Sequence, residues 1–239
     1  MNKKLIIFDK DGTLLDFDAY WIPVSKAALS DMVKIAELDE KVVSEIFDAF
    51  DVKNGITAIT SSLCYGTYDD MGHDIFGVLS KYSSKLSEDE VKRLTRELYH
   101  KHIKKGKIKP TSEKLCDTLA KLKKDGYILG VVTSDAPLVT DECLKALNIR
   151  DFFSFIISDD GIMPTKPNPK SIEFLCEKYA MSKNELLMVG DTLADVAYAK
   201  NGGIEVFGLA KTDENSKILE SNGADAVIGE ISEIYTMLK

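Results

Sequence analysis

The chain has 239 residues, with 31 basic and 39 acidic side chains that give a net charge of −8. Its apolar content of 44% is that of a globular protein, and it excludes a disordered tail, a coiled coil and a collagen-like chain. The acidic balance excludes a nucleic-acid binder that relies on overall positive charge, because the phosphate backbone attracts basic surfaces.

The N-terminus contains only four consecutive apolar residues, Leu5 to Phe8, which is too few for a signal peptide. No apolar run in the sequence approaches the length of a membrane span. The four cysteines are far apart and form no C-x-x-C pair, which is typical of buried thiols in a reducing compartment. We therefore expect a cytoplasmic protein with neither a membrane nor a nucleic acid as its partner.

Six short apolar segments predict strands that are buried on both faces of a parallel sheet. They span residues 5–8, 127–132, 155–157, 186–189, 204–207 and 226–228. Segments with helical periodicity alternate with the later strands, at residues 113–124, 138–147, 169–179, 193–201 and 213–221. This alternation predicts an α/β fold with a Rossmann-like, doubly wound parallel sheet.

Several of these helices carry recognisable end signals. Ser112 is expected to cap the first of them, and Ser182 with Glu185 has the spacing of a capping box before the fourth strand. The run Asn201-Gly202-Gly203 is expected to end a helix, because glycine readily adopts the left-handed conformation that follows helices. The local signals therefore agree with the predicted alternation.

Residues 16–109 interrupt this pattern, because no buried strand is expected there. Helical segments are predicted instead, at residues 20–37, 40–50, 63–82 and 88–104. Such a stretch is far too long for an ordinary connection between a strand and a helix. The sequence thus predicts a helical domain of residues 16–109, inserted after the first strand of an α/β core that comprises residues 1–15 and 110–239.

Two carboxylates, Asp9 and Asp11, directly follow the first predicted strand and precede Gly12. The carboxyl ends of parallel strands are where such folds bind ligands, so both side chains can reach one small volume. A calcium loop of the EF-hand type is excluded, because Leu14 stands where that loop requires glycine and Tyr20 where it requires glutamate. An ordinary surface turn is the remaining alternative.

Three further polar segments follow or flank other predicted strands. Thr133 and Ser134 end the second strand with hydroxyl and backbone N–H groups that suit an anionic oxygen, although Ser134 or Asp135 could instead cap the next helix. Lys166 lies in a proline-containing loop, where it either supplies a positive charge to a phosphate or is simply solvated. Two more carboxylates follow the fourth strand.

These two, Asp191 and Asp195, are one helical turn apart and therefore face the same way, unless they serve only to begin a helix. Together and in this order, the four segments resemble the haloacid dehalogenase-like superfamily, in particular its phosphoglycolate phosphatase-like members. The run from Asp9 to Thr13 matches the first motif, Thr133 the second, Lys166 the third, and Asp191 with Asp195 the fourth.

The helical insertion also matches the position of that family's cap domain. One departure is Thr165, where many relatives carry glycine. The resemblance implies a Mg²⁺-dependent phosphatase that hydrolyses a small organic phosphomonoester, such as phosphoglycolate or a sugar phosphate. Asp9 would be the nucleophile that forms an aspartyl-phosphate, and Asp11 the general acid and base.

The resemblance implies the remaining roles as well. Mg²⁺ would be held by the carboxylates of Asp9 and Asp191 and by the main-chain carbonyl of Asp11. Thr133, the backbone N–H of Ser134 and Lys166 would hold the oxygens of the transferring phosphoryl group. Asp195 would not contact the phosphoryl group directly but would orient Lys166 or a metal-bound water.

Alternative functions stay open within and outside the enzymes. A sugar phosphomutase of the β-phosphoglucomutase type shares the cap position and both aspartates of the first motif. Phosphonate hydrolysis is disfavoured, because it needs a cap lysine in a setting that the sequence does not reveal. A non-catalytic phospho-ligand-binding member is disfavoured, because Asp9, Asp11 and Lys166 are all present.

Overall fold

The computed structural model describes residues 2–238, which divide into two compact units. The first comprises the chain up to Asp16 and again from Ile108, and we call it the core unit. The second spans Phe17–Lys107, and we call it the helical unit. Each unit has its own hydrophobic core.

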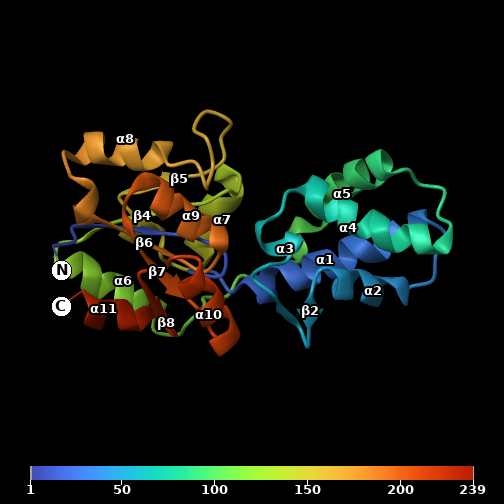
Figure 1. The fold of residues 1–239 in the computed structure, drawn as a ribbon, viewed down its shortest axis with the longest axis horizontal. Coiled ribbons are helices and arrows are strands. Elements are labelled where there is room, and N and C mark those ends of the chain that lie inside the picture. The colour runs from blue at the N-terminus through green and yellow to red at the C-terminus, as the bar shows by residue number, and fades with distance from the viewer. Residues whose placement is uncertain (1, 239) are drawn as a thin grey trace. The chain divides into compact units, whose positions relative to one another are not determined.

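The core unit contains a six-stranded sheet in which every neighbouring pair is parallel. Its strand order is β5-β4-β1-β6-β7-β8, as Figure 1 shows. The strands are β1 (Leu5–Phe8), β4 (Ile128–Val132), β5 (Phe155–Ile157), β6 (Leu186–Gly190), β7 (Glu205–Leu209) and β8 (Ala226–Ile228). The predicted α/β fold with a doubly wound parallel sheet is confirmed.

The central strand β1 lies between β4 and β6, and all four of its side chains are buried. Phe8 is in register with Val131 of β4 and with Val189 of β6. Because the three strands are parallel and in register, their carboxyl ends meet at one edge of the sheet. The loops that follow β1, β4 and β6 are therefore neighbours, and these loops carry most of the predicted site residues.

Helices cover both faces of the sheet. They are α6 (Leu115–Lys124), α7 (Pro137–Ala146), α8 (Lys170–Tyr179), α9 (Leu193–Gly202), α10 (Asp213–Ser221) and α11 (Ile234–Met237), with short 3-10 turns at Arg150–Phe152, Lys183–Glu185 and Ile231–Glu233. Leu119 of α6, Leu144 of α7 and Ile234 of α11 pack into one cluster with Phe8. Figure 1 shows α8 on the other side of the sheet from α6 and α11.

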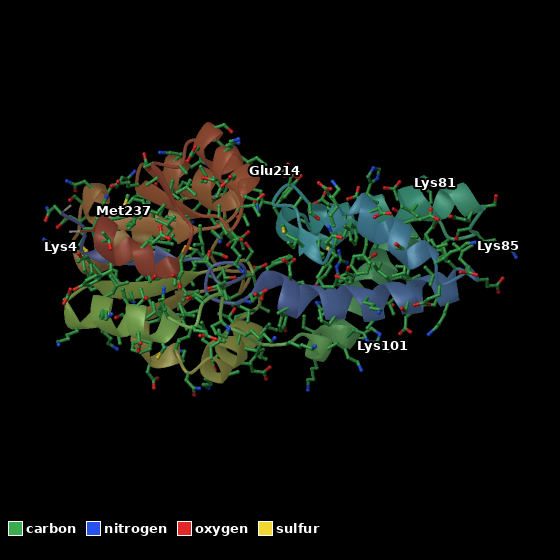
Figure 2. The ribbon with its side chains drawn as sticks, turned by 90° about the horizontal axis from the view of Figure 1, so that it is seen from below. Lys4, Lys81, Lys85, Lys101, Glu214 and Met237 are labelled. Atoms are coloured by element: carbon green, nitrogen blue, oxygen red, sulfur yellow. The ribbon has the colours of Figure 1, made fainter. Side chains whose placement is uncertain are left out.

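The helical unit is built from α1 (Phe17–Ile35), α2 (Val42–Ala49), α3 (Ser62–Tyr65), α4 (Tyr68–Leu79) and α5 (Glu88–His102), with 3-10 turns at Ser80–Tyr82 and Ile103–Lys105. Its apolar core includes Leu29, Ile46, Ile75 and Val91, one from each of the four longer helices. On its surface, Lys101 Nζ donates to Asp31 at 2.7 Å and ties the end of α5 to α1; Figure 2 labels Lys101.

Two local predictions for this unit were incomplete. The structure adds a hairpin of β2 (Val52–Lys53) and β3 (Ile56–Thr57), whose strands are too short to show an alternating pattern. Its turn places Asn54 and Gly55 at φ of 53° and 75°, which this residue pair readily adopts in hairpins. The helix predicted over 63–82 is divided, because Gly66 is extended and Thr67 starts α4 with a capping box.

The predicted helix ends of the core unit had mixed outcomes. Ser182 and Glu185 form the expected capping box, and Gly203 ends α9 in the left-handed conformation. The prediction for Ser112 was wrong, because the residue at the start of α6 is Lys114. The Ser112 hydroxyl donates to Glu230 at 2.6 Å and accepts from the Lys114 N–H at 3.1 Å, just before the helix starts.

Over residues 2–238, no helix combines the length and the apolar character that crossing a membrane would require.

Candidate active site

The turn after β1 presents Asp9 and Asp11 at the carboxyl edge of the sheet. The backbone N–H of Asp9 donates to Val189 O at 2.9 Å, which continues the pairing of β1 with β6 past the end of the strand. Gly12 then turns the chain with a φ of +86°, and a Cβ at this position would overlap the carboxylate of Asp191. Glycine is therefore required both for the backbone conformation and for the approach of Asp191.

Asp191 leaves the end of β6 and is held by the same turn. Its Oδ1 accepts a hydrogen bond from the Thr13 hydroxyl at 2.7 Å. Carboxylate oxygens of Asp9, Asp191 and Asp195 all lie within 4.8 Å of one another. Residues from the first and fourth predicted motifs, separated by about 180 positions in the chain, thus meet in one cluster.

Lys166 supplies the positive charge of this cluster. Its Nζ contacts the Asp9 carboxylate and donates to Asp195 Oδ1 at 2.5 Å, and its side chain is only 5% exposed. The alternative in which Lys166 is a solvated loop lysine does not hold. Helix α9 holds the loop that carries Lys166, because the Asn201 amide donates to Pro167 O at 3.0 Å.

Asp195 is fully buried and uses both carboxylate oxygens. While Oδ1 accepts from Lys166, Oδ2 accepts from the Thr192 hydroxyl at 2.7 Å and from the Thr192 N–H at 3.0 Å. This capping box starts α9 and at the same time orients Lys166. Gly190 permits the arrangement, because a Cβ there would overlap the Asp195 side chain.

The cluster contains three carboxylates and one ammonium group, and burial together with this charge imbalance raises the pKa of Asp9 and Asp191. Burial raises the pKa of Asp9 to about 7, although Lys166 acts against this shift. Burial, together with the negative charges of Asp9 and Asp195, raises the pKa of Asp191 well above its usual value. A further cation would relieve this repulsion, and an all-oxygen ligand set is the kind that Mg²⁺ prefers.

The loop after β4 carries the predicted phosphate-binding groups. Thr133 is 5% exposed; its N–H donates to Ile157 O at 2.9 Å, and its hydroxyl accepts from the Asp135 N–H at 3.3 Å. Ser134 is exposed. The residue at the start of α7 is Ala136, which has no side-chain cap, so neither Ser134 nor Asp135 serves as the helix cap.

One charged residue of this region, Lys10, was not among the predicted site residues. Its side chain is completely buried, and its Nζ lies 2.5 Å from Asp11 Oδ1 and 2.9 Å from Asp135 Oδ2. Burial alone would lower the pKa of Lys10, but the two carboxylates outweigh this effect and raise it. Strand alternation could not have revealed it, because β1 ends at Phe8 and Lys10 lies in the turn that follows.

Residues 6–209 match the family model described as haloacid dehalogenase-like hydrolase. The chain belongs to this family. The resemblance drawn from the four motifs is thereby confirmed, and so is the prediction that the protein is an enzyme, a hydrolase.

The curated relatives include a phosphoglycolate phosphatase from Vibrio parahaemolyticus. It is 28% identical over 235 residues, which cover 98% of this chain and 96% of the relative. A pyrophosphatase, PpaX, from Bacillus cereus is 27% identical over 169 residues, which cover 70% of this chain and 74% of the relative.

Solved structures show the same fold. A predicted phosphoglycolate phosphatase from Haemophilus somnus has a TM-score of 0.72 at 23% identity and covers 100% of this chain, with 99% of its own length matched. A protein described as the HAD hydrolase YfnB from Bacillus subtilis, bound to magnesium, has a TM-score of 0.67 at 17% identity and covers 99% of both chains.

Proposed function

We propose that the protein is a Mg²⁺-dependent phosphatase that hydrolyses a small organic phosphomonoester through an aspartyl-phosphate on Asp9. The observation that carries this proposal is the buried cluster itself, in which the Asp9 carboxylate touches Lys166 beside Asp191 and Asp195. A nucleophile, a cation for phosphate oxygens and an acidic metal-binding pair would then act within one small volume.

Asp9 is suited to attack phosphorus because the surrounding structure holds it rigidly. The backbone on one side is paired to β6, and the carboxylate contacts the buried ammonium of Lys166. A fixed carboxylate can approach the phosphorus atom in line with the leaving oxygen, which is the geometry that phosphoryl transfer needs. Lys166, Thr133 and the N–H of Ser134 would hold the equatorial oxygens.

The described residues fit Mg²⁺. Asp9 and Asp191 would hold the ion with their carboxylates, and Asp11 with its main-chain carbonyl, while Asp195 is already engaged with Lys166 and Thr192. When bound, Mg²⁺ would neutralise the repulsion between an anionic nucleophile and an anionic phosphate. The raised pKa values of Asp9 and Asp191 support this assignment, because they indicate negative charge that the protein alone does not compensate.

Asp11 would carry the proton in both half-reactions. It would protonate the leaving oxygen when the phosphoryl group passes to Asp9, and it would then deprotonate the water that releases phosphate. Asp195 would act as a positioning residue, since it reaches the reaction only through Lys166.

We propose small phosphate esters as the class of substrate. The full-length similarity to a phosphoglycolate phosphatase supports an organic phosphomonoester, while the partial similarity to a pyrophosphatase adds inorganic pyrophosphate as a compound to test. We further propose that residues 16–109 serve as a cap that selects the substrate, in keeping with the separate helical unit, and that the protein acts in the cytoplasm.

A panel of phosphate compounds with and without Mg²⁺ tests this function. The panel contains 4-nitrophenyl phosphate, phosphoglycolate, glucose 6-phosphate, β-glucose 1-phosphate, a nucleotide and pyrophosphate. We expect release of phosphate from at least one monoester, and its loss on chelation of the metal. Isomerisation of β-glucose 1-phosphate without phosphate release would instead identify a sugar phosphomutase, and no turnover of any compound would refute the proposed function.

A further inference from the structure

Lys10 is a charged residue that has no role in the proposed reaction as described above. Its side chain has no exposed surface, whereas lysine in globular proteins is almost never fully buried unless it is paired. An ammonium group removed from water is costly unless opposite charges surround it at hydrogen-bonding distance. The position of its partners therefore indicates what the residue does.

Two carboxylates that contact Lys10 come from loops of the active site. Asp11 belongs to the turn after β1, and its Oδ1 lies 2.5 Å from Lys10 Nζ. Asp135 belongs to the loop after β4, directly beyond Thr133 and Ser134, and its Oδ2 lies 2.9 Å from the same nitrogen. One buried ammonium thus joins the candidate acid–base residue to the candidate phosphate-binding loop.

The backbone of Lys10 is tied into the same turn. Its carbonyl accepts from the N–H groups of Leu14 at 2.9 Å and Leu15 at 2.8 Å. The main chain of Lys10 is consequently fixed, and its side chain extends from a rigid base. An ammonium placed in this way restricts the rotation of the Asp11 carboxylate, which is 17% exposed.

We propose that Lys10 is a positioning residue for phosphoryl transfer, which holds the Asp11 carboxylate in register with the phosphate-binding loop through Asp135. This inference rests on the proposed function, because it assigns Lys10 to the proton-transfer step. The rate of proton transfer depends strongly on the position of the Asp11 carboxylate, since a misplaced catalytic group loses much of its effect even when the fold persists.

The test compares two leaving groups in the variant Lys10→Met. A nitrophenolate leaves without a proton, whereas the alkoxide of an alkyl ester needs one from Asp11. We expect kcat/KM for phosphoglycolate and glucose 6-phosphate to fall by roughly 100-fold, the lower end of what general acid catalysis contributes. For 4-nitrophenyl phosphate we expect a fall of less than about tenfold, because kcat/KM reports the steps up to phospho-enzyme formation, and this leaving group departs there without a proton from Asp11. An equal loss for both kinds of ester would overturn the proposal.

Lys3→Met is the matched control. The Lys3 side chain is 7% exposed, pairs with Glu205 at 2.8 Å and lies just before the other end of the same strand. Its neighbour Lys4 is seen in Figure 2 at the end of the core unit opposite to Glu214, which follows the carboxyl end of β7. Loss of a buried lysine at that end is expected to lower the melting temperature but to leave the ratio of the two kcat/KM values unchanged.

Asp135→Asn keeps the proposal testable if Lys10→Met does not fold. It leaves the contact of Lys10 with Asp11 but removes the charge that draws the ammonium toward the β4 loop. The same selective loss is expected at a smaller amplitude, and no change in the ratio between alkyl and aryl esters would overturn the proposal.

Crystal structures decide the question independently of turnover. In Lys10→Met, or in Asp135→Asn if the former is unstable, the Asp11 carboxylate or residues 133–135 should move from their wild-type positions. An unchanged arrangement would overturn the proposal. If the wild type hydrolyses none of the esters, the proposed function fails, and this structural comparison still decides whether Lys10 positions Asp11.

Discussion

Protons and Mg²⁺ should compete for Asp9, so that the affinity for the metal depends on pH. The pKa of Asp9 is raised to about 7 by burial, and a metal ligand must give up its proton before it binds. At pH 8 about nine-tenths of the Asp9 side chains are ionised, and at pH 6 about one-tenth. The apparent affinity should therefore fall by roughly tenfold from pH 8 to pH 6 through Asp9 alone.

Asp191 should steepen this dependence, because its pKa is raised in the same direction by burial and by the charge of Asp9. Isothermal titration calorimetry of Mg²⁺ at pH 6, 7 and 8, in buffers of different ionisation enthalpy, measures both the affinity and the protons released. Asp9→Asn is the control, since it removes one titrating ligand and should flatten the profile. An affinity that is independent of pH, or tighter at pH 6, would refute the reasoning.

Three further changes test other parts of the site. Asp9→Asn should lower kcat by roughly three orders of magnitude or more, as loss of a nucleophile does in other covalent enzymes, and rapid-quench labelling should detect no phospho-enzyme. Asp11→Asn should lower kcat by roughly 100-fold or more while calorimetry shows unchanged Mg²⁺ binding, because its proposed metal contact is a main-chain oxygen. Gly190→Ala should destabilise the core by about 1–3 kcal/mol in thermal unfolding, because the new methyl group overlaps Asp195. The control Gly77→Ala lies in open space on α4 and should raise stability slightly; equal effects of the two would contradict the steric argument.

The core sheet was predictable because its strands are short apolar runs with clear limits. The bounds of β1, β5 and β8 agree with the predicted segments, since burial on both faces demands apolar residues throughout. The β2–β3 hairpin could not be recognised in this way, because two-residue strands carry no periodicity. Its signal was the turn pair Asn54-Gly55, which lies between the helices predicted over residues 40–50 and 63–82.

The positions of the site residues along the chain were informative, but their contacts depend on tertiary structure. That Asp191 and Asp9 approach each other follows from the adjacency of β1 and β6, which no local pattern specifies. The contact of Lys166 with Asp195 likewise depends on how α9 packs against the preceding loop. Ser112 shows the converse, because α6 starts at Lys114 and the Ser112 hydroxyl donates to a distant partner, Glu230, which no local pattern indicates.

The turn after β1 pairs carboxylates with buried lysines in an otherwise acidic protein. The Asp9 carboxylate contacts Lys166, and the next residue, Lys10, contacts Asp11 and Asp135. Each buried lysine is thus shared by two carboxylates, and each set keeps a net negative charge. The net charge of −8 acts mainly on solubility and distant encounter, whereas binding depends on the local field. Asp191 accepts a hydrogen bond from Thr13 and lies beside Asp9, so a divalent cation at that point would convert the acidic cluster into an anion-binding site.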